Sequence, residues 1–164
     1  MADAGLYAEV RALIARESLA LDRRRWQEWL DLFTDDVVYW VPAWRSEDEL
    51  TDDPRTQLSL IYLDGRGGLE ERVFRVESRD SVASLPLDRT THLVSNVLIE
   101  AVRESGVDVS ATWLVHSFGS RGTAIRGGRY EYTLRRVNGA LKIARKKIVL
   151  IDEKLEGTVD VYHL

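Results

Sequence analysis

Four side chains of this sequence carry the functional groups of general acid–base chemistry. They are two lone histidines on segments with strand-like alternation, His92 and His116, and an acid and a phenol close together in sequence, Asp36 and Tyr39. Imidazole exchanges protons near neutral pH, and a carboxylate or a phenol can share a proton abstraction or a dehydration with it. If the fold gathers the four in one cavity, the chain is a free-standing dehydratase, isomerase or cyclase. Otherwise each histidine is expected to lie in the core or line a cavity with a satisfied hydrogen bond.

Other metal and cofactor chemistries lack their ligand patterns in this sequence. It has no cysteine, which excludes disulfides, thiolate nucleophiles, iron–sulfur clusters and cysteine-bound zinc. The three histidines lack the H-x-x-x-H spacing of a metal site, and the glycines at 65, 67 and 68 lack the full dinucleotide fingerprint. The acidic stretch 47–53 lacks the central Gly and the terminal Glu of a calcium loop. We therefore expect this chain to bind no metal and no cofactor.

Length and composition indicate one soluble domain over residues 1–164. Hydrophobic residues make up 45% of the 164 positions and charged residues 30%, with five Trp, six Tyr and three Phe. A chain of this size can bury one hydrophobic core, and its aromatic side chains argue against disorder. Neither a signal peptide nor an apolar run long enough to cross a bilayer is visible, so we expect a cytoplasmic protein with no membrane partner.

The charges are unevenly distributed along the chain although they nearly cancel in total. The formal net charge is −4, yet residues 28–55 hold nine acids against two bases, and residues 121–147 hold nine bases against one acid. A basic block can indicate nucleic-acid binding. Strand alternation would scatter these bases over both faces of a sheet, however. We therefore expect no nucleic-acid partner and instead pairing between the two segments, within one subunit or between subunits.

Apolar side chains recur at helical spacing in the first part of the sequence. A helix is expected at residues 5–20, a second one capped by Asp22 and ended by residues 34–36, and a third, short one at 69–78. The apolar stripes of the first two helices are expected to face the core. The first stripe comprises Leu6, Val10, Leu13, Ile14 and Glu17, and the second comprises Trp26, Trp29, Leu30 and Phe33.

The later part of the chain alternates with a period of two, which is typical of strands. Asn138-Gly139 predicts a hairpin with a type I′ turn, and Gly127-Gly128 is expected to open the strand before it. Residues 45–55 are expected to form a polar loop and residues 158–164 a final extended piece. This order indicates an α+β fold, in which a curved antiparallel sheet packs on N-terminal helices and encloses a cavity. The expected strands span residues 37–40, 58–63, 89–102, 107–120, 129–137 and 140–151.

Seven segments of this sequence together resemble the small (β) subunits of aromatic-ring-hydroxylating dioxygenases, which are Rieske non-haem iron enzymes. They cover nearly the whole chain in the family's order, and they most resemble the benzoate, toluate and anthranilate dioxygenase branch. The segments are 26–33 (WQEWLDLF), 39–44 (YWVPAW), 50–54 (LTDDP), 59–62 (SLIY), 68–75 (GLEERVFR), 89–97 (RTTHLVSNV) and 159–164 (VDVYHL).

This resemblance implies a cone-like fold of the nuclear transport factor 2 type and a mainly structural role in an oxidoreductase. The implied enzyme is NADH- and O2-dependent and cis-dihydroxylates an aromatic acid or related ring. Its α subunit would carry the Rieske [2Fe–2S] cluster and the mononuclear iron, a reductase would pass electrons from NADH, and the subunits would form an α3β3 hexamer. The missing cysteines agree, because a Rieske centre needs two Cys and two His. No catalytic residue is transferred to this chain, so the four acid–base candidates belong to the alternative, a free-standing cavity enzyme.

Overall fold

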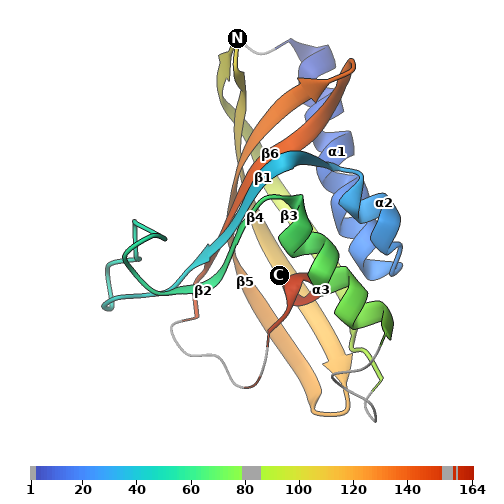
Figure 1. The fold of residues 1–164 in the computed structure, drawn as a ribbon, viewed down its shortest axis with the longest axis vertical. Coiled ribbons are helices and arrows are strands. Elements are labelled where there is room, and N and C mark those ends of the chain that lie inside the picture. The colour runs from blue at the N-terminus through green and yellow to red at the C-terminus, as the bar shows by residue number, and fades with distance from the viewer. Residues whose placement is uncertain (1–2, 79–85, 153–156, 158) are drawn as a thin grey trace.

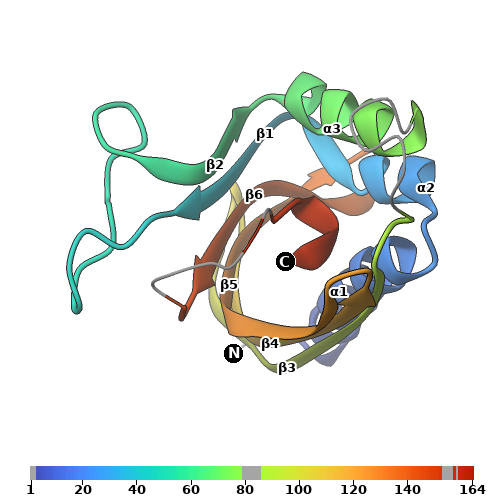
Figure 2. The same cartoon turned by 90° about the horizontal axis from the view of Figure 1, so that it is seen from below.

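A curved sheet and three α-helices build a cone-like molecule with the C-terminal segment inside the curve (Figures 1 and 2). The computed structural model describes residues 3–78, 86–152, 157 and 159–164. The helices are α1 (Ala4–Asp22), α2 (Trp26–Leu30), α3 (Arg66–Ser78) and the 3-10 helix η1 (Val161–His163). The predicted α+β fold is thus confirmed.

The six strands form one sheet in the order β2-β1-β6-β5-β4-β3. All neighbours pair antiparallel except β1 and β6, which are parallel, so the prediction of a wholly antiparallel sheet is wrong at this one junction. The strands are β1 (Phe33–Pro42), β2 (Ser59–Asp64), β3 (Arg89–Arg103), β4 (Gly106–Gly119), β5 (Gly122–Val137) and β6 (Ala140–Leu150).

The predicted second helix is wrong at both ends, although its apolar stripe is core. Asp22 is the last residue of α1, and α2 begins after Arg25 without a side-chain cap. Phe33 opens β1 instead of ending the helix, because the Leu32 carbonyl accepts a hydrogen bond from Ile143 N of β6 at 2.8 Å. The pairing with β6 therefore overrides the helical spacing. The predicted core residues of this stretch are all buried: Trp26, Trp29, Leu30 and Phe33.

Two further expectations about the strand-rich part need correction. Gly127-Gly128 lies inside β5, because a Cβ on Gly128 would come within 1.9 Å of the Val149 carbonyl oxygen of β6. Glycine here permits close approach of two backbones and does not mark a strand end. The segment 159–164 is no strand either. It forms η1, where Asp160 caps the helix and the Nδ1 atom of His163 accepts a hydrogen bond from Asp160 N.

Candidate functional site

The structure does not bring the four acid–base candidates together. Asp36 lies on the exposed part of β1, where Arg135 donates a hydrogen bond of 2.6 Å to it and holds its pKa at about 2. This ion pair is one contact of the kind predicted between the acidic and the basic segments. Tyr39 is buried inside the cone. His116 points outward from β4 and is exposed, because alternation along the strand turns its neighbours Val115 and Ser117 inward.

His92 is a buried histidine with both ring nitrogens in contact with polar partners. Its Nδ1 atom lies 2.5 Å from the Asp22 carboxylate, and its Nε2 atom lies 3.3 Å from the main-chain oxygen of Leu164. Burial alone would raise the pKa of Asp22, but hydrogen bonds from His92 and Thr90 outweigh it and lower that pKa. The expectation of a satisfied interior histidine thus holds for His92, whereas it is wrong for the exposed His116.

The interior of the cone holds a charged pair that sequence reasoning did not single out. Lys146 of β6 places Nζ 2.5 Å from Oε1 of Glu17 on α1. The second carboxylate oxygen accepts a hydrogen bond of 2.8 Å from the Tyr132 hydroxyl of β5. The two charged side chains are at most 2% exposed. Helix α1 and the β5–β6 hairpin, which lie far apart in sequence, therefore meet at one ion pair inside the cone.

Aromatic rings enclose the Lys146 ammonium on its other sides. Its Nζ atom lies 4.0 Å from the ring centre of Tyr130, 5.6 Å from that of Tyr132 and 5.9 Å from that of Tyr39. Trp113 stacks on Tyr130 with ring centres 5.3 Å apart. These electron-rich faces stabilise a cation inside the cone.

Burial determines the ionisation behaviour of this interior cluster. It lowers the pKa of Lys146, although the Glu17 carboxylate opposes the shift. Burial and the same carboxylate raise the pKa of Tyr39, Tyr130 and Tyr132 well above the ordinary value. The hydroxyls of Tyr39 and Tyr130 have no hydrogen-bond partner among the described residues. With its ammonium paired and enclosed by rings, the cluster forms a polar part of the core.

The C-terminal segment closes the open end of this interior (Figure 2). His163 Nε2 lies 3.0 Å from the Asp88 carboxylate, and Arg72 of α3 lies 3.2 Å from Asp160. Tyr162 packs edge-on against Trp26 with ring centres 6.1 Å apart. Contacts to α2, α3 and the loop before β3 therefore hold the segment in place.

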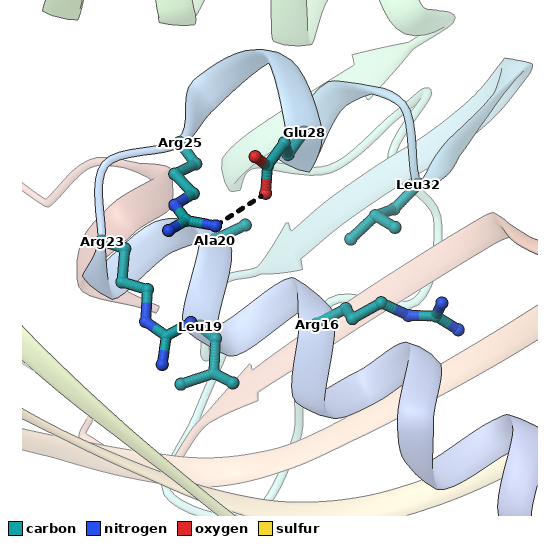
Figure 3. Close-up of a pocket in the computed structure, with 7 residues that line it drawn as sticks. All are labelled: Arg16, Leu19, Ala20, Arg23, Arg25, Glu28 and Leu32. Atoms are coloured by element: carbon teal, nitrogen blue, oxygen red, sulfur yellow. Dashed lines mark ion pairs between the residues drawn. The ribbon is translucent and has the colours of Figure 1, made fainter.

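An open pocket lies outside the cone, between α1 and α2 (Figure 3). Its volume is about 170 Å³. The charged residues that line it are Arg16, Arg23, Arg25 and Glu28, all exposed, and Arg25 pairs with Glu28 at 3.5 Å. None of the acid–base candidates lines it.

Neither a metal-binding cluster nor a membrane-spanning helix is found among the described residues. Within residues 3–78, 86–152, 157 and 159–164, no three His, Asp or Glu side chains are grouped closely enough to hold a metal ion. No helix in the same part of the chain combines the length and the apolarity that a bilayer crossing requires.

Known proteins with the same fold and sequence pattern identify the family. Residues 16–156 match the family described as ring hydroxylating beta subunit. The 2-halobenzoate 1,2-dioxygenase small subunit of Burkholderia cepacia is 40% identical over 158 residues, which cover 96% of each chain. The benzoate 1,2-dioxygenase beta subunit of Burkholderia mallei has a crystal structure that superposes with a TM-score of 0.80 at 32% identity, covering 100% of this chain and 99% of that one.

A more distant structure shows how widely the fold occurs. A scytalone dehydratase-like protein of Novosphingobium aromaticivorans superposes with a TM-score of 0.66 at 19% identity, covering 88% of this chain and 83% of that one. This likeness concerns the fold alone, and it confirms the predicted fold of the nuclear transport factor 2 type. The family match and the two close relatives show more: this chain belongs to the ring hydroxylating beta subunits, the small subunits of aromatic-ring dioxygenases.

Proposed function

We propose that this chain is the non-catalytic β subunit of an oxygenase that cis-dihydroxylates an aromatic acid or a related ring. Its relatives support this substrate class, since they are small subunits of a 2-halobenzoate dioxygenase and of a benzoate dioxygenase. The chain then contributes assembly and support, and it supplies no reacting group. We propose further that it is a single domain over residues 1–164 and works in the cytoplasm.

One observation carries the non-catalytic assignment: the interior of the cone is occupied by its own paired and packed side chains. Glu17 and Lys146 neutralise each other there, and Tyr130 packs over the ammonium. The exposed His116 and the Asp22-bound His92 lie on different sides of the sheet. Chemistry on a ring needs an open site next to the reacting groups, whereas the charged groups inside this cone are paired with one another.

The redox groups of such an enzyme do not fit the residues of this chain. A Rieske cluster takes two Cys and two His, and this sequence has no cysteine. A mononuclear iron site takes two His and a carboxylate around one ion. Here His92, His116 and His163 each lie next to different partners. We therefore assign the cluster and the iron to an α subunit, with electrons from NADH passed on by a reductase.

The partner is accordingly an α subunit, and we propose an α3β3 hexamer in which three copies of this chain form a trimer. The experiment is co-expression with a benzoate-type α subunit, followed by purification through a tag on this chain. The α subunit is expected to co-purify, and turnover of benzoate-like acids is expected only when both subunits and an electron-transfer chain are present.

The same preparation tests the opposite view. Purified alone, this chain is expected to be colourless, nearly iron-free and inactive with NADH and aromatic acids. Stoichiometric iron or a Rieske-type visible band in the isolated chain would overturn the assignment. Dehydration or isomerisation of a small substrate by the chain alone, abolished by removal of His92 or Asp36, would favour the free-standing cavity enzyme instead.

A further inference from the structure

The connection between β1 and β2 extends away from the rest of the molecule (Figures 1 and 2). We call residues 43–58 the arm. Its internal bonds include the Trp44–Leu50 bridge and hydrogen bonds from the Asp52 and Asp53 amides to the Gln57 side chain. The arm is thus a structured loop that projects into solvent from one edge of the sheet.

The arm carries more acids than bases and ends in an exposed apolar side chain. Glu47, Asp48 and Asp52 are exposed and form no close ion pair among the described residues. Leu58, at the end of the arm, is 83% exposed. A projecting segment with three exposed carboxylates and an unburied leucine is the kind of surface that a partner covers.

A second unpartnered surface lies on the outer face of β3, β4 and β5. Four large apolar side chains there, which we call the outer patch, are 41% to 61% exposed. Leu93 lies opposite Leu114, and Ile125 lies opposite the exposed His116 of β4, which stands between Leu114 and Phe118. The four apolar side chains therefore surround one exposed imidazole on this face. The outer patch comprises Leu93, Leu114, Phe118 and Ile125.

The rim of the outer patch is basic, which matches the charge of the arm. Arg89 pairs across the strands with Phe118 and places its guanidinium 5.3 Å from that ring. Arg89 is exposed and has no acidic partner among the described residues. The exposed carboxylates of the arm and this arginine are therefore complementary in charge.

We propose that the arm of one copy of this chain docks on the outer patch of the next copy. The arm leaves the sheet at the β2 edge, whereas the outer patch lies near the β3 edge at the other end of the strand order. Contact between two different surfaces is heterologous, and repeated contacts of this kind close into a ring when the rotation allows. A second copy of this chain supplies a surface that matches the arm in both charge and apolar character. The inference rests on the proposed function, because it names the surfaces that join the proposed trimer.

Cysteine pairing tests the contact directly, since the natural chain has no cysteine to interfere. We would make D52C on the arm and R89C at the outer patch, alone and combined, and treat each with a short bismaleimide. The combined variant is expected to give covalent dimers and trimers on a denaturing gel. A mixture of the two single variants is expected to give covalent dimers and nothing larger. Each single variant is expected to stay monomeric on that gel. Absence of cross-linked species from the combined variant would overturn the proposal.

Charge reversal tests the same contact without a cross-linker. D48K/D52K on the arm is expected to weaken self-association about tenfold or more, as is R89E at the outer patch, because like charges meet. Combining all three changes is expected to restore the trimer in light scattering. The matched control E77K/E104K changes two exposed acids on α3 and the β3–β4 turn and is expected to stay trimeric.

The results that would overturn the arm contact differ from those that would overturn the proposed function. A monomeric natural chain, or a trimeric D48K/D52K variant, would overturn the arm contact. A D48K/D52K variant that stays trimeric but loses the α subunit would assign the arm to that subunit, which also overturns it. Failure of the natural chain to co-purify with an α subunit would count against the proposed function, whatever its oligomeric state.

Discussion

Lys146 Nζ lies 2.5 Å from Glu17 Oε1 inside the cone, where both side chains are almost completely buried. Removing two charges from water is costly, and their attraction offsets this cost only when the remaining polar atoms are also satisfied. The Tyr132 hydroxyl serves the second carboxylate oxygen, and the Tyr130 ring faces the ammonium. The pair therefore ties α1 to β5 and β6 across the interior.

Loss of one partner should destabilise the fold far more than loss of both. Lys146→Met leaves the Glu17 carboxylate buried without its cation, which is expected to lower the free energy of unfolding by about 3–5 kcal/mol. Glu17→Leu/Lys146→Met removes both charges and is expected to recover most of this loss. Urea unfolding of the isolated chain measures both values. As a control, Lys142→Met on the same strand is expected to change stability by less than about 0.5 kcal/mol. Equal losses in the single and double variants would contradict this account.

The two neighbouring tyrosines of β5 should respond oppositely to removal of their hydroxyls. Tyr132→Phe removes the hydrogen bond that the hydroxyl donates to Glu17. This is expected to lower the free energy of unfolding by about 1–3 kcal/mol, because the carboxylate oxygen stays buried. Tyr130→Phe removes a buried hydroxyl that finds no hydrogen-bond partner in the described part of the chain, so stability is expected to stay level or to rise. Each variant is the control for the other in thermal melts. A larger loss for Tyr130→Phe would mean that its hydroxyl has a partner after all.

The interior tyrosines should make the protein sensitive to alkali. Burial raises the pKa of Tyr39, Tyr130 and Tyr132 well above the ordinary value of 10.0, so the folded state keeps protons that the unfolded state releases. Stability is therefore expected to be complete below pH 10 and to fall as the pH rises beyond it. Urea unfolding at several alkaline pH values, with tyrosinate absorbance, measures this slope. The Tyr39→Phe/Tyr130→Phe variant is expected to show a shallower slope. An unchanged slope would mean that these tyrosines do not cause the loss of stability in alkali.

Local periodicity predicted the elements well where neighbours in sequence decide the structure. It failed at residues 31–33, where the spacing of Trp26, Trp29, Leu30 and Phe33 favours a longer helix. There Phe33 pairs with Ile143 of β6, a contact that no local pattern can reveal. The parallel junction of β1 and β6 escaped prediction for the same reason, since it joins the first strand to the last.

The interior cluster could be predicted only in part. Glu17 stands on the apolar stripe of the first helix, so a buried carboxylate in need of a partner was visible in the sequence. Lys146 lies between two further bases, and only the strand register turns it inward while Arg145 and Lys147 lie beside the Trp40 ring. Which residues meet inside the cone depends on pairings between distant parts of the chain, so residue type alone did not indicate this cluster.

His92 of β3 and His116 of β4 should contribute differently to stability, and neither should take part in turnover. His92→Ala removes the contacts to Asp22 and Leu164, and a loss of about 1–3 kcal/mol is expected, with faster hydrogen exchange in residues 161–164. His116→Ala, on the exposed face, is expected to change stability by less than about 0.5 kcal/mol. Neither should alter aromatic-acid turnover per intact complex with an α subunit. General acid–base catalysis contributes about a hundredfold or more, so a loss of that size, with assembly and iron content preserved, would identify a catalytic group in this chain.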